Sequence, residues 1–135
     1  MESVFIASDQ RGFFLKESMK RHFAKKIEFN DLGVHSIEPV FFPLIGVKLG
    51  KTISSEGGGK KGIVLCEKGI EMNAIINKFP GAKSAFIMDG RAAKIARERH
   101  DANVACMSIQ NVNEMLAARI IEVFLKTEYI GNREK

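Results

Sequence analysis

The chain has 135 residues, of which 45% are hydrophobic and 27% are charged, and this predicts one folded domain over residues 1–135 rather than a disordered chain. Its longest apolar stretches are far shorter than the roughly 20 residues that span a bilayer, so we expect no membrane partner. The formal net charge of +5 would suit a nucleic-acid-binding protein, but the lysines are interleaved with acidic residues and not with aromatic ones, so we expect no nucleic-acid partner.

Short apolar runs alternate with segments of helical periodicity along the chain. The expected strands are residues 4–7, 27–33, 63–66, 84–88 and 104–107. The expected helices are residues 13–24, 43–54, 70–78, 92–99 and 112–128. We interpret the lysines of the first helix, including Lys16, as part of a solvated face.

This alternation predicts an α/β fold: a three-layer, Rossmann-like αβα domain with a five-stranded parallel sheet. Each crossover between parallel strands places a helix over one face of the sheet, so both faces become covered. The carboxyl ends of the strands then form one edge of the sheet, here called the rim, where ligands usually bind. Asp9, Cys66, Asp89 and Ser108 fall at or near the ends of expected strands and should lie at this rim.

Six segments carry motifs in a fixed order. They are residues 8–17 (SDQRGFFLKE), 31–33 (DLG), 62–66 (GIVLC), 77–81 (NKFPG), 97–104 (RERHDANV) and 124–133 (FLKTEYIGNR). Together they resemble the ribose-5-phosphate isomerase B / galactose-6-phosphate isomerase family, whose first motif reads SDHAGFELKE. The resemblance covers nearly the whole chain. It implies a phosphorylated sugar as substrate and no cofactor.

The resemblance also implies an aldose–ketose isomerisation through an enediolate, with Cys66 as the base that moves the proton. Asp9 and His100 are further catalytic candidates, and the backbone of Gly69–Met72 is the candidate binding site for the enediolate. A thiolate base needs a lowered pKa, which the helix N-terminus after Cys66 could supply. Without the resemblance, Cys66 would be interpreted as an inert strand cysteine, and for Cys106 we expect core packing.

The loop after Cys66 departs from the family motif CGTGIGMS. Glu67 and Glu71 stand where the family has glycine, and Lys68 stands where it has threonine. Two carboxylates would repel an anionic intermediate and a phosphorylated substrate, and they would raise the pKa of the thiol. Four further family residues are replaced: two histidines by Gln10 and Arg99, a tyrosine by Phe42 and an arginine by Gln110. We therefore expect the turnover of ribose 5-phosphate to be weak or absent.

The candidate substrate-binding residues come from this loop and from more distant segments. They are Lys68, Gly69, Ile70, Glu71, Arg99, Asn103 and Arg133. Several have a second interpretation that the sequence leaves open. Asp9 could cap the first helix, Asn103 could fix a turn, and Arg133 and His100 could be surface residues. Lys68 and Arg99 could supply positive charge to a phosphate.

Two functions remain open at this stage. The first is a sugar-phosphate isomerase with an altered substrate preference, and the second is a catalytically degenerate relative that acts as a binding protein or as a subunit of a hetero-oligomer. Because the family builds each site from two protomers, the resemblance implies a homodimer or higher oligomer. In it, loop 66–73 would face the partner's residues 99–103 and 133. Phe41, Phe42 and the apolar face of the last helix are candidate contact surfaces.

We expect no metal site, because no group of His, Cys, Asp and Glu has metal-ligand spacing. The first five residues show no basic segment followed by an apolar one, so we expect no secretory signal. Both cysteines lie in apolar runs typical of buried, reduced thiols. A cytoplasmic location follows as an expectation.

Overall fold

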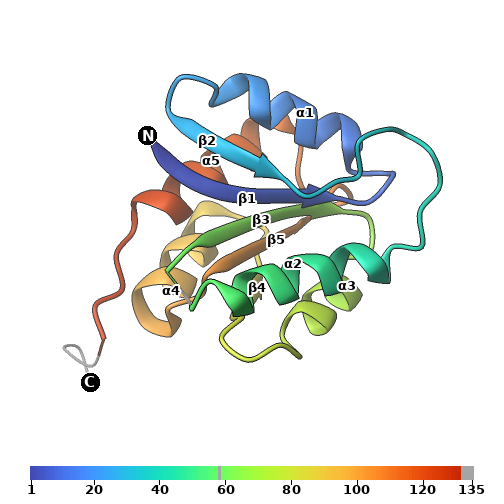
Figure 1. The fold of residues 1–135 in the computed structure, drawn as a ribbon. Coiled ribbons are helices and arrows are strands. Elements are labelled where there is room, and N and C mark those ends of the chain that lie inside the picture. Colours follow the sequence, from blue (N-terminus) through green and yellow to red (C-terminus); the bar gives the residue numbers. More distant parts are fainter. Residues whose placement is uncertain (58, 132–135) are drawn as a thin grey trace.

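The computed structural model describes residues 1–57 and 59–131, and it shows a parallel sheet between two layers of helices (Figure 1). The strands are β1 (Glu2–Ser8), β2 (Ile27–Asp31), β3 (Lys61–Cys66), β4 (Ser84–Phe86) and β5 (Val104–Ser108). The helices are α1 (Phe13–His22), α2 (Pro43–Ser55), α3 (Gly69–Ile76), α4 (Gly90–His100) and α5 (Glu114–Lys126). No helix in the described part of the chain is long and apolar enough to cross a lipid bilayer. The predicted αβα fold with five parallel strands is confirmed.

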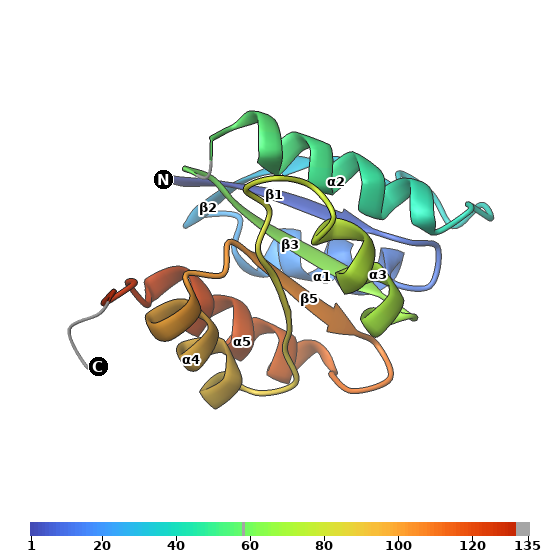
Figure 2. The same ribbon diagram turned by 90° about the horizontal axis from the view of Figure 1, so that it is seen from below.

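The strands follow the order β2-β1-β3-β5-β4, and every neighbouring pair is parallel. Figure 2 shows α2 and α3 on one side of the sheet and α4 and α5 on the other, and α1 packs beside α5. The registers place Ser8 beside Leu65 and Cys66 beside Ser108. The three central strands therefore end close together, at the rim.

The central strands are buried on both faces. Ile6 and Ile63 point into the core under α1, α4 and α5, whereas Ala7 and Val64 point into the core under α2 and α3. All four side chains are fully buried. A strand covered on both sides favours a continuous apolar run. For this reason, the apolar runs in the sequence predicted these strands.

The apolar face of α5 packs inside the protomer. Its buried side chains are Ala117, Ile120, Ile121 and Phe124, and all belong to the core under α1, α4 and α5. The expectation that this face contacts a second copy is therefore wrong, because its apolar atoms already cover the sheet.

Lys16 is fully buried, so its assignment to a solvated face is also wrong. Its Nζ donates to both carboxylate oxygens of Asp31 at 2.7 Å and also to the carbonyl of Val34. Lys20 donates to the same carboxylate at 2.8 Å. Burial alone would raise the pKa of Asp31, but the hydrogen bonds from Lys16, Lys20 and the Gly33 N–H outweigh it and lower the pKa.

We predict that Asp31→Asn lowers the free energy of unfolding by about 3 kcal/mol at pH 7, because it leaves the buried Lys16 ammonium without its counter-charge. A carboxylate with a depressed pKa stabilises the fold above its unfolded-state pKa, and this stabilisation is lost as the pH falls through the folded-state value. The difference between the variant and the wild type should therefore shrink below a pH of about 4.

Urea unfolding at neutral and at acidic pH measures this difference. The control is Glu2→Gln, because Glu2 pairs with Lys61 at the protein surface, where such pairs contribute about 0–1 kcal/mol. Equal effects of the two substitutions at neutral pH would contradict the assignment.

Candidate active site

The residues predicted to lie at the rim are found there. Cys66 and Ser108 are the last residues of β3 and β5, and Asp9 follows β1 directly. Asp89 follows β4 and caps α4, since its Oδ1 accepts the N–H of Ala92 at 2.7 Å. The strand arrows in Figure 1 point toward this edge.

Asp9 joins two loops of the rim. Its Oδ1 accepts the N–H of Gly12 at 2.8 Å, and its Oδ2 accepts the N–H of Glu67 at 3.0 Å. The turn before α1 also packs directly on β3, because a Cβ at Gly12 would lie 2.0 Å from the carbonyl oxygen of Leu65. The side chain of Asp9 thus does more than serve the start of α1: it fixes the loop after Cys66.

Ser108 holds the same loop from the other side. Its hydroxyl donates to the carbonyl of Glu67 at 2.8 Å and accepts the N–H of Gln110 at 3.1 Å. The peptide groups on the two sides of Glu67 are therefore fixed by Asp9 and by Ser108. The sequence placed Ser108 at the rim, but no motif indicated this contact.

Gly69 begins α3 against an aromatic ring. A Cβ at this position would lie 2.2 Å from the ring of Phe86, so the close approach requires glycine. The first turn of any helix leaves N–H groups without acceptors inside the helix, here those of Gly69, Ile70 and Glu71. These donors, together with the helix dipole, favour an anionic group at this place.

Cys66 is fully buried beside Cys106. Its Sγ donates to the carbonyl of Met107 at 3.6 Å, and the Sγ of Cys106 donates to the carbonyl of Gly69 at 3.4 Å. The hydrogen bond with Cys106, burial, and the negative charges of Asp9 and Glu71 raise the pKa of the Cys66 thiol far above its ordinary value. The lowering expected from the helix is therefore wrong, whereas the predicted raising of the thiol pKa by a nearby carboxylate is confirmed for Glu71.

A pocket of about 630 Å³ opens beside the start of α3. It is lined by residues 67–71, by Phe86 and Met88, and by Ser108, Gln110 and Asn111. The carboxylates of Glu67 and Glu71 have no hydrogen-bond or ion-pair partner among the described residues, and the pocket also has the ammonium of Lys68 in its lining, so its lining side chains carry one net negative charge. In the same part of the chain, no three His, Cys, Asp or Glu side chains gather to hold a metal ion.

Three further candidates lie at the opposite edge of the sheet. Arg99 and His100 are exposed at the end of α4, and Asn103 directly precedes β5. A strand of five residues, such as β5, separates them from the rim by roughly 16 Å. The chain alone does not bring them to Cys66, and Arg133 lies outside the described residues.

Asn103 fixes a turn, which was one of its two interpretations. Its Nδ2 donates to the carbonyl of Gly81 at 2.8 Å, and its Oδ1 accepts the N–H of Lys83 at 2.8 Å. The amide thereby ties the segment before β4 to the start of β5. A contact with substrate remains a proposal.

The chain is similar in sequence and in structure to known proteins. The family described as Ribose/Galactose Isomerase matches residues 4–135. The chain is 30% identical to the ribose-5-phosphate isomerase B of Listeria innocua, over 98% of this chain and 89% of the relative. It is 33% identical to the 4-deoxy-4-sulfo-D-erythrose isomerase of a Clostridium species, over 98% and 84% respectively. The ribose-5-phosphate isomerase B of Mycoplasma genitalium, solved with bound ribulose 5-phosphate, superimposes with a TM-score of 0.91 at 28% identity, over 97% and 88%.

We predict that iodoacetamide modifies Cys66 slowly at neutral pH, because the raised pKa keeps the thiol protonated and burial blocks access. The rate should still rise at about pH 10.5, where that of an unperturbed thiol with a pKa near 8.5 has levelled off. Peptide mapping by mass spectrometry separates Cys66 from Cys106, and free glutathione is the control. Fast modification at pH 7 with a plateau would show that the thiol is an accessible thiolate.

Proposed function

Because the chain belongs to the ribose/galactose isomerase family, we propose that it binds a phosphorylated sugar at the rim and interconverts its aldose and ketose forms, with Cys66 as the base. One observation carries the proposal: the peptide groups of Glu67, fixed by Asp9 and Ser108, hold the short loop that joins Cys66 at the end of β3 to the start of α3 at Gly69. A base and a group of anion-binding donors near one another are the parts that an enediolate reaction needs.

In the proposed reaction, the thiolate of Cys66 takes a proton from the carbon beside the substrate carbonyl. The electron pair of the broken C–H bond forms the C=C bond of the enediolate, and the carbonyl oxygen becomes negative. The N–H groups of Gly69, Ile70 and Glu71 stabilise that oxygen. The hydroxyl proton on the neighbouring carbon moves to that oxygen, and the proton held by the Cys66 thiol passes to the former carbonyl carbon. The electron pair of the C=C bond takes up this proton, the neighbouring oxygen forms the new C=O bond, and the thiolate is restored.

Two features of the site oppose this reaction with ribose 5-phosphate. The thiol has a raised pKa, and the residues that line the pocket bring two carboxylates, those of Glu67 and Glu71, against one ammonium, that of Lys68. They favour the second candidate function, a degenerate relative that binds a ligand or completes a hetero-oligomer. We infer that turnover of ribose 5-phosphate is weak or absent.

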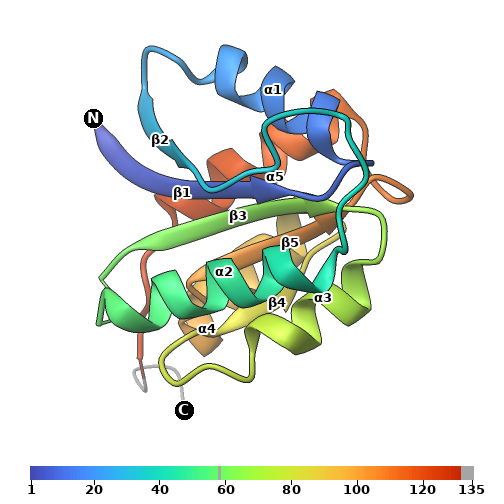
Figure 3. The same cartoon turned by 45° about the vertical axis from the view of Figure 1, so that its right-hand side comes forward.

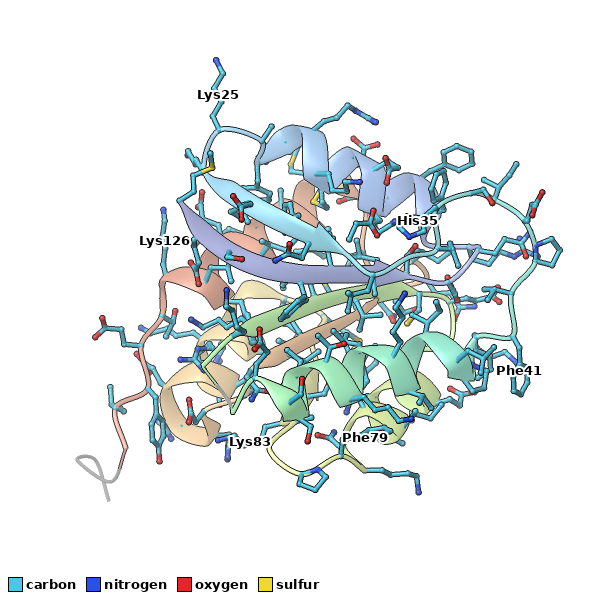
Figure 4. All side chains as sticks on the ribbon, viewed as in Figure 1. Lys25, His35, Phe41, Phe79, Lys83 and Lys126 are labelled. Atoms are coloured by element: carbon cyan, nitrogen blue, oxygen red, sulfur yellow. The ribbon has the colours of Figure 1, made fainter. Side chains whose placement is uncertain are left out.

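We also propose that two copies of the chain complete the site. Arg99, His100 and Asn103 can act together with Cys66 only from a second copy, because all three lie at the opposite edge of the sheet. Exposed apolar side chains at the rim support an interface there: Phe14, Phe41, Leu44, Ile70, Met88 and Met115. Figure 4 shows Phe41 projecting from the rim end of the molecule.

The proposed chemistry is tested with wild type, Cys66→Ala and the double variant Glu67→Gly/Glu71→Gly, assayed side by side with ribose 5-phosphate. We expect little or no wild-type turnover, and tighter phosphosugar binding in the double variant because two repulsive charges are gone. Robust wild-type turnover that vanishes in Cys66→Ala would show that the substitutions matter less than we infer. Unchanged affinity in the double variant would show that the carboxylates point away from the ligand.

The proposed association is tested by light scattering at tens of micromolar. We predict a mass of at least two chains for the wild type. Phe41→Asp should shift the equilibrium toward the monomer, since it places a charge among exposed apolar side chains. A wild-type monomer at this concentration would contradict a site shared between copies.

A further inference from the structure

A second, smaller hollow lies on the other side of the loop after Cys66. It occupies about 140 Å³ between the start of α1 and the start of α2, and Asp9, Arg11, Phe42, Glu67 and Lys68 are among its lining residues. Pockets that enclose a whole small molecule usually exceed about 300 Å³, so this hollow suits one group of a ligand. It shares Glu67 and Lys68 with the larger pocket, so a single ligand can reach both.

Two cations without counter-ions face this hollow. The guanidinium of Arg11 is exposed and has no hydrogen-bond or ion-pair partner among the described residues. The Nζ of Lys68 lies 5.4 Å from the centre of the Phe42 ring, and no carboxylate in the described part of the chain pairs with it. Figure 3 shows the segment between β2 and α2 passing along the rim. Phe42 is the last residue of this segment, directly before α2.

Two carboxylates also line the hollow, and they differ in whether hydrogen bonds compensate their negative charge. Asp9 is buried, and each of its oxygens accepts a backbone N–H, so its charge is compensated inside the protein. Glu67 has no such partner and opposes an anion. Two cations therefore face one uncompensated carboxylate.

The backbone positions of the two cations are fixed relative to each other. Arg11 precedes Gly12, whose Cα packs against the Leu65 carbonyl, and Lys68 follows Glu67. The carboxylate of Asp9 bonds to the N–H groups of Gly12 and Glu67, which are the neighbours of the two cations. The backbone of a site held in this way loses little freedom when a ligand binds, so the entropic cost is confined to the two side chains.

We propose that this hollow binds the tetrahedral oxyanion of the ligand, a phosphate or a sulfonate, with Arg11 and Lys68 as its cations. The motifs that the chain resembles have alanine and threonine at these two positions, so these charges belong to this chain in particular. The proposal rests on the proposed function for the sugar part of the ligand, but it requires no turnover. Arg11 supplies a fork of N–H donors that fits two oxyanion oxygens, and Lys68 supplies a point charge.

The test is calorimetric titration of the full chain with ribose 5-phosphate, ribose, inorganic phosphate and methanesulfonate. Arg11→Gln and Lys68→Met should each weaken ribose 5-phosphate binding roughly tenfold or more, because each removes a charge-assisted contact. Methionine keeps an unbranched stem for the contact with Phe42. The matched controls Arg21→Gln and Lys51→Met change exposed residues outside the hollow and should leave affinity unchanged. Glu67→Gln should strengthen binding.

The outcomes separate this proposal from the proposed function. If ribose 5-phosphate binds wild type and both variants equally, the oxyanion site is overturned while the family function stands. If phosphate or methanesulfonate binds with dependence on Arg11 and Lys68 but none of a panel of phosphorylated and sulfonated sugars is isomerised, the oxyanion site stands and the isomerase proposal fails. The stronger of these two probes identifies the oxyanion. Binding of neither probe at millimolar concentration overturns the site.

Discussion

The carboxylate of Asp9 is the contact on which the rim depends. It is buried and accepts one backbone N–H from the turn before α1 and one from the loop before α3. Hydrogen bonds to a charged group contribute about 1.5–3 kcal/mol each, and here they also set the distance between two loops. Ser108 holds the second loop from β5. The wall between the two pockets is built from this loop, so their shapes are fixed together.

The same close packing explains why the chain keeps the backbone of an anion-binding site but surrounds Cys66 with groups that oppose a thiolate. Gly69 lies against Phe86 and its carbonyl accepts the thiol of Cys106, so the space around Cys66 is filled and dry. A dry environment near negative charge favours a neutral thiol. The rim keeps the backbone donors of an anion site, while the side chains around them oppose the formation of a thiolate. The burial of Cys66 and the negative charges near it, and not the arrangement of the backbone, therefore limit the reactions that the site can catalyse.

The sequence predicted the layers and the rim because both follow from local patterns. Buried parallel strands are continuous apolar runs, and Asp9, Cys66 and Asp89 follow or end such runs. The sequence did not predict contacts between side chains that are far apart along the chain. Lys16 looks like any helical lysine until Asp31, 15 residues away, is placed beside it. The sequence predicted that a carboxylate would raise the pKa of Cys66, as Glu71 does, but the larger contribution comes from Cys106 in the neighbouring strand, which no spacing rule reveals.

The two outer strands of the sheet limit how copies of this protein can associate. β4 has only three residues, and the exposed side chains Glu28 and Asn30 alternate along β2. A short edge and a polar edge both discourage the addition of a foreign strand. Association through continued sheets, which leads to open-ended aggregates, is therefore disfavoured at both sides. Closed assemblies built from helix and loop surfaces are the form of self-association that this fold permits.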